Sequence, residues 1–344
     1  MKADATAIPL DYRARTRTRG LFLLLAAALV ITAAMIGLCV GASKMGPADI
    51  VTALFRDNGR NHSIIWMLRL PRIAMAVLAG FGLGVAGVVF QAILRNPLAS
   101  PFTLGIGSGA GFGAVTVIIF FGGGFQIYLV AGSAFVFAFG SALLILAVAR
   151  MKHASPETMI LTGIAQMFLF SALTSLFQYM GTMEQVSEVV FWHFGSLSKA
   201  GWKEIGIAAL MILIPVPFLF RKSWDLNLLT TGDDSALALG VDVERLRMSC
   251  VVAASLTTAG CICFCGVIGF IGLVAPHIVR MSIGGDHQYL LPASGLTGAV
   301  LVLFADILGR TIWMPQVIPI GIMTSFIGVP FFFYLLMKRT REYW

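Results

Sequence analysis

The chain has 344 residues, of which 58% are hydrophobic and only 12% are charged, and its mean hydropathy is +0.90. Because a soluble domain carries about 25% charged residues, this composition excludes a soluble globular fold and favours an integral membrane protein. The net charge of +8 does not indicate a nucleic-acid-binding protein, because there is no soluble basic domain to bind nucleic acid.

Apolar runs long enough to span a bilayer, about 17–25 residues each, recur along the chain. They lie at 20–41, 72–94, 103–122, 127–149, 158–180, 204–220, 248–265, 267–279, 290–309 and 318–337. The eighth run is short, and the stretch 186–197 is shorter still, so we expect the latter to form a re-entrant or interfacial helix. The sequence therefore predicts an all-α polytopic membrane protein of about ten transmembrane helices, with a single membrane domain (20–344) after a basic cytoplasmic tail (1–19).

Lys and Arg are distributed unevenly between the two sides of such a protein. With the N-terminus in the cytoplasm, 16 of the 24 Lys and Arg lie on the cytoplasmic side and 8 lie outside. Positive residues favour the cytoplasmic side, so we expect both termini to be cytoplasmic. The outer arginines are exceptions to this trend, and Arg69 and Arg72, in the motif RLPR, stand out among them.

Two explanations fit Arg69 and Arg72 equally well from composition. They could be membrane anchors whose charges reach the interface, or they could bind carboxylates of an external partner through the planar guanidinium.

The longest cytoplasmic segment, 221–247, is amphipathic, and loops of this length in compact proteins are usually functional. The chain has no G-x-x-x-x-G-K-[ST] phosphate loop and is not expected to hydrolyse ATP. Apart from Glu204, the first residue of its run, Asp306 is the one carboxylate we place inside a predicted span, so a proton relay is not expected either. If the protein pumps, another subunit supplies the energy, and this loop is a candidate docking surface for it.

Three other motifs invite a functional interpretation but are better explained by packing. Gly82-x-Gly84-x-x-Gly87 matches a dinucleotide fingerprint, but it lacks the preceding strand and the later acidic residue. Close helix contacts at Gly80-x-x-x-Gly84, Gly105-x-x-x-Gly109 and Gly109-x-x-x-Gly113 fit better.

Cys261, Cys263 and Cys265 cannot converge on a metal from one regular helix, and His277 has no second ligand at a suitable spacing. We therefore assign no metal site.

A set of motifs in order resembles the FecCD-type permeases, the membrane subunits of type II ABC importers for iron-siderophores, haem and cobalamin. The matching stretches are RLPR (69–72), the glycine-rich segment 80–111 that contains RNPLASP, FWHFGSL (191–197), TTGDDSALALGVDVERLR (230–247), GVIGFIGLVAPHIVR (266–280), DH (286–287), ADILGR (305–310) and 319–336. They cover most of the chain beyond residue 65.

The resemblance implies a homodimer in the bacterial cytoplasmic (inner) membrane, without a cofactor of its own. Two ATP-binding subunits carry Mg-ATP, and a periplasmic binding protein delivers the cargo. It also implies functions for individual residues, each by its match to the family. They are binding-protein docking (Arg69, Arg72 and Arg310), ATPase coupling (Gly232, Asp233, Ser235, Ala236, Leu239 and Gly240) and a cytoplasmic gate (Asn96, Pro97, Leu98, Ser155, Pro156 and Glu157).

The chain departs from the resembling family at Val317, where the family usually has Glu, so we assign no acidic function there. An iron-siderophore is the expected cargo, and haem, cobalamin or an oxyanion are alternatives that the sequence leaves open. An ion-coupled secondary carrier is a more distant alternative, which the lack of midplane carboxylates disfavours. A membrane-embedded enzyme would need clustered catalytic groups, and the sequence shows none.

Overall fold

The computed structural model describes residues 8–41, 45–55, 59–122, 127–151 and 155–337, and these residues form helices without any strand. In chain order the helices are α1 (Ile8–Cys39), α2 (Pro47–Phe55), α3 (Arg60–Ser63), the π-helix η1 (Ile64–Arg69), α4 (Leu70–Ile93), α5 (Ile106–Phe121), α6 (Ile127–Arg150), α7 (Pro156–Met180), α8 (Met183–Phe194), α9 (Trp202–Leu213), α10 (Pro215–Arg221), α11 (Ser223–Leu229), α12 (Asp233–Ala238), α13 (Val243–Cys265), α14 (Ile271–Ile283), α15 (His287–Thr311) and α16 (Ile320–Met337).

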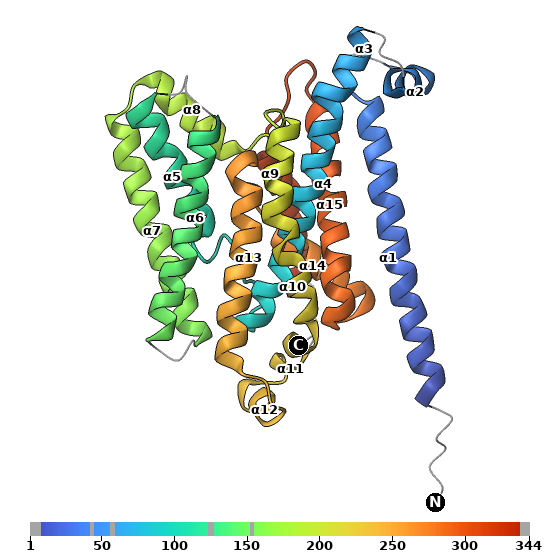
Figure 1. Ribbon diagram of the computed structural model, residues 1–344, viewed down its shortest axis with the longest axis vertical. Helices are drawn as coiled ribbons and strands as arrows, with labels where there is room; N and C mark the ends of the chain where they lie inside the picture. Colours follow the sequence, from blue (N-terminus) through green and yellow to red (C-terminus); the bar gives the residue numbers. More distant parts are fainter. Residues whose placement is uncertain (1–7, 42–44, 56–58, 123–126, 152–154, 338–344) are drawn as a thin grey trace, which may run out of the picture.

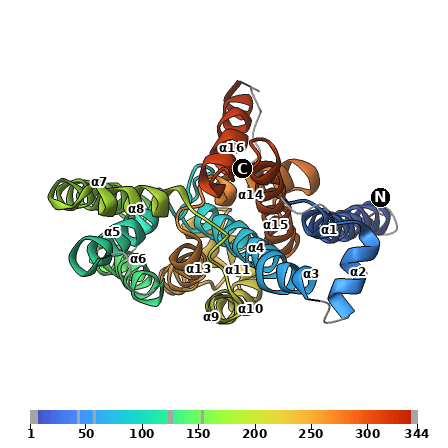
Figure 2. The same ribbon diagram turned by 90° about the horizontal axis from the view of Figure 1, so that it is seen from above.

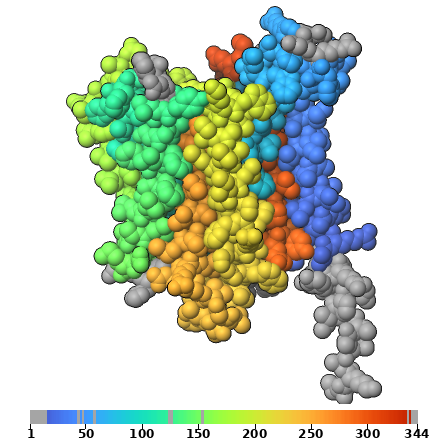
Figure 3. All heavy atoms as spheres, in the orientation of Figure 1, coloured from blue at the N-terminus to red at the C-terminus, as the bar shows by residue number. Residues whose placement is uncertain are grey.

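The helices are arranged around α4, which lies among α13, α14 and α15 (Figures 1 and 2). Helices α5, α6, α7 and α8 form a group on one side, and α1 lies on the other against α15. In Figure 3, α9 and α10 cover the face between α6 and α1. We call the end with α11 and α12 the α12 end and the opposite end, with α2, α3 and α8, the α8 end (Figure 1).

The expected membrane architecture is confirmed. Seven helical stretches in the described residues are long and apolar enough to cross a membrane, and three shorter apolar helices accompany them. Together they coincide with the ten apolar runs of the sequence. Helix α8, with 12 residues, occupies the short apolar stretch predicted as re-entrant or interfacial.

Local sequence signals set several helix starts. Ser155, Asp242 and Asp286 are the N-caps of α7, α13 and α15, and each side chain accepts a hydrogen bond from a backbone N–H of the first turn. Such caps satisfy donors that have no partner within the helix.

Some predicted boundaries are wrong. The second span does not begin at residue 72, because α3, η1 and α4 form one stretch from Arg60 to Ile93. A proline removes a helical hydrogen bond, but the wider π-helix before Pro71 accommodates it, since the Leu70 N–H bonds to the Ile65 carbonyl. The described residues of the basic segment are already helical from Ile8, and the candidate first span within α1 begins at Thr16.

The segment 221–247 is likewise not one long loop. Helix α10 extends to Arg221, two short helices follow, and α13 begins at Val243. The span predicted at 204–220 is itself divided, with α9 ending at Leu213 and α10 beginning at Pro215.

Glycines of α4 allow backbone contact with its neighbours, as the sequence predicted. A Cβ at Gly80 would overlap the Gly298 carbonyl of α15, and one at Gly84 would overlap the Ser294 carbonyl. A Cβ at Gly87 would overlap the Gly272 carbonyl of α14. The G-x-G-x-x-G sequence is therefore a helix-packing surface, and no nucleotide could reach these backbone groups.

Gly84→Val should destabilise the protein strongly, because the side chain would meet backbone that cannot rotate away. Overpacking costs about 1–3 kcal/mol where neighbours can adjust, and more is expected here. The measurement is the melting temperature in detergent. Gly140→Val on α6 is the matched control, since nothing lies within 4 Å of its added Cβ; equal melting temperatures for the two variants would contradict the packing argument.

Candidate functional site

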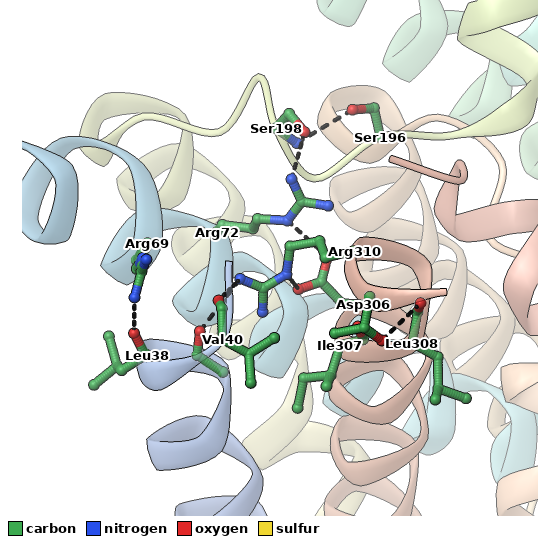
Figure 4. A network of polar contacts seen from close by, with 12 residues as sticks. Leu38, Val40, Arg69, Arg72, Ser196, Ser198, Asp306, Ile307, Leu308 and Arg310 are labelled. Atoms are coloured by element: carbon green, nitrogen blue, oxygen red, sulfur yellow. Dashed lines mark hydrogen bonds and ion pairs between the residues drawn. The ribbon is translucent and has the colours of Figure 1, made fainter. Parts of the chain in front are cut away.

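The three arginines singled out in the sequence lie at the α8 end, where Arg72 and Arg310 flank Asp306 and Arg69 lies beside the end of α1 (Figure 4). The Nε of Arg72 donates to the Asp306 carboxylate at 2.7 Å, and the Nε of Arg310 lies 3.0 Å from its other oxygen. The Asp306 side chain is only 1% exposed. This carboxylate therefore neutralises part of the positive charge within the chain itself.

Arg69 and Arg310 also bind the end of α1. Arg310 donates to the carbonyls of Gly37 and Val40 at 3.2 and 2.9 Å, and Arg69 donates to the Leu38 carbonyl (Figure 4). The last carbonyls of a helix lack intrahelical partners and carry partial negative charge. The two guanidinium groups thus cap α1, and both are buried, at 6% and 8% exposure.

Arg72 differs from the other two because it also faces a cavity. Its Nη1 donates to the Ser198 hydroxyl at 2.6 Å, in the segment after α8. It lines a cavity of about 850 Å³ at this end, together with Ser196, Ser198, Lys199 and residues of α8. Of the three arginines, Arg72 has the guanidinium that an occupant of this cavity would meet.

The cavity has both charge signs on its walls. Glu184 and Glu188, one turn apart on α8, line it together with Arg72 and Lys199. Hydrogen bonds from its own backbone N–H and from Thr182 hold the pKa of Glu184 below its usual range, so this carboxylate is ionised at neutral pH. Val317, where we expected no acidic function, also lines the cavity.

The residues expected to couple to an ATPase lie on and around α12, at the opposite end of the molecule (Figure 1). Gly232 precedes α12 with φ at 117°, and Gly240 follows it with φ at 88°, so both positions favour glycine. Leu239 is 63% exposed, whereas Ala236 is fully buried within this chain. Leu239 is therefore accessible to a partner at this surface, and Ala236 is not.

The two segments expected to form a gate also lie at the α12 end. Asn96 makes a tight turn in which its side chain accepts from the Leu98 N–H at 2.9 Å, and Leu98 is 48% exposed. Ser155 caps α7, with Pro156 and Glu157 in its first turn. Among the described residues these segments share no hydrogen bond or ion pair, so this structure does not itself bring them together.

The sequence did not single out Arg247. This residue of α13 is 2% exposed and binds Asp233 of α12 through both nitrogens of its fork, at 2.8 and 2.7 Å. Arg247 lay at the end of the segment 221–247, which was expected to be an amphipathic cytoplasmic loop. The one signal was an arginine within the motif RLR that precedes a long apolar run.

The thiols of Cys261, Cys263 and Cys265 are all buried in α13. The Cys261 sulfur packs against Gly82 of α4 and donates to the Ala79 carbonyl at 3.7 Å. His277 packs against Phe331. In the part of the chain that the structure describes, no group of three or more His, Cys, Asp or Glu is arranged to hold a metal.

Comparison with known proteins assigns this architecture to a family. The FecCD transport family profile matches residues 28–338. The chain belongs to this family. It is therefore the membrane permease subunit of an ABC importer, and the family implies ATP-binding and binding-protein partners.

Individual relatives cover nearly all of the chain. A Methanocaldococcus jannaschii protein assigned as an ABC transporter permease, MJ0087, is 43% identical over 97% of this chain and 99% of its own. The Fe(3+)-citrate import system permease YfmE of Bacillus subtilis is 40% identical over 94% of this chain and 96% of its own. A solved inward-facing structure of a protein assigned as a metal-chelate type ABC transporter superposes with a TM-score of 0.83, at 34% identity, over 92% of this chain and 98% of that one.

Other relatives are named for different cargoes. Permeases named for hemin (Yersinia pestis), molybdate (Haemophilus influenzae) and cobalamin (Halobacterium salinarum) are 34%, 38% and 36% identical to this chain, over 89%, 91% and 80% of it and 93%, 94% and 74% of their own lengths. Family membership alone therefore does not select the cargo.

Asp306→Asn should destabilise the protein, because it leaves the buried charges of Arg72 and Arg310 without their carboxylate. Removing one partner of a buried ion pair costs about 3–5 kcal/mol, which should appear as a lower melting temperature in detergent. In the control, Asp225→Asn, the lost partner is Lys222, and both side chains are about one-third exposed. That change should cost at most about 1 kcal/mol, so equal melting temperatures would show that the arginine cluster does not stabilise the fold.

Proposed function

We propose that this chain imports a metal chelate and that its cargo is a ferric chelate of the citrate or siderophore class. In this proposal it acts as a homodimer in the cytoplasmic membrane, with both termini and the α12 end in the cytoplasm. A binding protein delivers the chelate to the α8 end, and ATP-binding subunits at the α12 end drive transport. The observation that supports this proposal is that the same helical domain has a cavity at one end and, at the other end, the short helix α12 with exposed leucines.

The cargo proposal is supported by the relatives together with the cavity. One relative more than 90% covered by this chain is named for Fe(3+)-citrate, and the solved transporter is assigned to the metal-chelate type. The cavity of about 850 Å³ lies within the size range of small-molecule sites, about 300–1,000 Å³. Arg72 and Lys199 would attract the carboxylates of a ferric chelate.

Docking of the binding protein is proposed at the arginine cluster, with Arg72 as the residue most available to it. Arg69 and Arg310 are occupied by α1 and Asp306, so they would support Arg72 or exchange partners on docking. At the opposite end, Asn96 to Leu98 and Ser155 to Glu157 are proposed as the two sides of a gate that meets across the homodimer. This is consistent with the separation of the two segments within one chain.

The proposed cargo can be tested by reconstitution with the ATP-binding subunits and the binding protein in proteoliposomes. Ferric citrate and a ferric hydroxamate should accumulate only with internal ATP, and hemin, cobalamin and molybdate should not. The measurement is uptake of labelled cargo at equal protein density. ATP-driven uptake of molybdate or cobalamin without uptake of iron would contradict the cargo proposal, and uptake without the ATP-binding subunits would contradict the proposed energy source.

Leu239→Glu should weaken assembly with the ATP-binding subunits, because it replaces an exposed leucine that the proposed contact would bury with a carboxylate. Burying an unpaired charge costs several kcal/mol, so co-purification of the ATP-binding subunits should fall at least about tenfold. The matched control is Val317→Glu, which puts the same side chain on another exposed aliphatic position, 47% exposed, at the α8 end. Normal assembly of Leu239→Glu would contradict docking at α12.

A further inference from the structure

An ion pair between the buried Arg247 of α13 and the partly exposed Asp233 links α12 to α13, and the same arginine reaches the end of α4. Arg247, in the second turn of α13, is the largest fully buried side chain among the described residues. Its two terminal nitrogens bind the two oxygens of Asp233, the first residue of α12. A bidentate arginine–carboxylate pair fixes orientation as well as distance, so α12 is held in one position relative to α13.

The same guanidinium also binds α4. The Nε of Arg247 donates to the Ile93 carbonyl at 3.0 Å, at the last residue of α4. Arg95 lies just beyond, with its Nη1 3.7 Å from the Asp233 carboxylate. The end of α4 therefore contacts α12 through two guanidinium groups that share one carboxylate.

The turn that follows is short and tightly held. Arg95 has a positive φ of 47°, which is uncommon for a residue other than glycine. The Asn96 N–H bonds to the Gln91 carbonyl at 3.1 Å, and the Asn96 side chain binds the Leu98 N–H. Only two residues, Leu94 and Arg95, lie between Ile93 and Asn96, so a displacement of Ile93 would be passed on to the proposed gate.

We propose that Arg247 and Asp233 transmit force from α12 to the segment 93–98, so that movement of α12 by the ATP-binding subunit moves the proposed gate. This rests on the proposed function, in which α12 is the contact with that subunit. Arg247 is a positioning residue in this scheme, since it touches neither ATP nor cargo. Its planar fork is essential, because one flexible ammonium group cannot hold Asp233 and the Ile93 carbonyl in a fixed relation.

The test uses the complete transporter and the amount of cargo imported per ATP hydrolysed. Arg247→Lys keeps the charge but loses the fork, so assembly and ATP hydrolysis should persist while import per ATP falls about tenfold, a typical coupling effect. A spectroscopic or thiol label on Leu98→Cys should lose its difference between the nucleotide-free and ATP-bound states. The matched control is Arg245→Lys, two residues earlier, whose side chain is 90% exposed and pairs with Asp242.

A second variant covers the case in which a buried lysine prevents folding. Arg247→Met combined with Asp233→Asn removes both charges at similar volume, a change that buried pairs often tolerate in stability. This double variant should fold and assemble, yet import less cargo per ATP. Wild-type import per ATP in either variant, or a loss of import that only parallels lower stability and lower ATPase activity, would overturn the proposal.

Two different results distinguish a failure of the proposed docking at α12 from a failure of the proposed function of Arg247. If α12 does not contact the ATP-binding subunit, Leu239→Glu will assemble normally. If α12 does make that contact but Arg247 does not transmit its motion, Leu239→Glu will fail to assemble while Arg247→Lys assembles and imports with normal stoichiometry.

Discussion

The close packing of α4 is the constraint on which the other features depend. Lipid tails are as apolar as leucine side chains, so helices in a bilayer associate through tight packing rather than through the hydrophobic effect. Gly80, Gly84 and Gly87 bring the α4 backbone against α15 and α14. As a result, 78% of its most apolar window is buried, against 17% for α1 and for α7. Both ends of α4 are thereby fixed, and each end carries one of the charged clusters.

Each charged cluster gives partners to helix-end carbonyls and to charges that would be costly to leave unpaired in a membrane. At the α8 end, Arg69 and Arg310 satisfy carbonyls of α1, and Asp306 pairs with Arg310 and Arg72. At the α12 end, Arg247 satisfies a carbonyl of α4, and Asp233 balances it. Charges in membrane segments are costly unless paired, so these positions at helix ends are where polar backbone and charge can compensate each other. The same arginines that could bind a partner therefore also hold the helices together.

The sequence predicted the spans and the glycine contacts because both depend on local patterns of apolar and small residues. It did not predict the helix from Arg60 through Pro71, because a proline usually marks a helix start and the π-helix that absorbs it has no clear sequence signal. The charged pairs were less accessible still. Arg72 and Asp306 are 234 residues apart, and no local pattern indicated their pairing, although the excess of outer arginines and the family resemblance both pointed to a site there. Asp233 and Arg247 are near in sequence, but both lay in a segment that was expected to be one amphipathic loop. The burial of the Arg247 side chain beside Asp233 is a property of the fold.

The position of the packing contacts along α4 also determines where motion can occur. The contacts at Gly80, Gly84 and Gly87 lie between Arg72 and Ile93, and they join backbone directly to backbone. Packed interfaces of this kind do not deform continuously. A force applied at Ile93 would therefore not travel along α4 to the α8 end, since α4 would have to slide against α14 and α15 together. It would be absorbed by the residues after Ile93, where the chain leaves the helix and Leu98 is exposed. With this arrangement of helices, the α12 end can open or close while the cavity at the α8 end keeps its shape. Communication between the two ends then requires α4, α14 and α15 to move as one body.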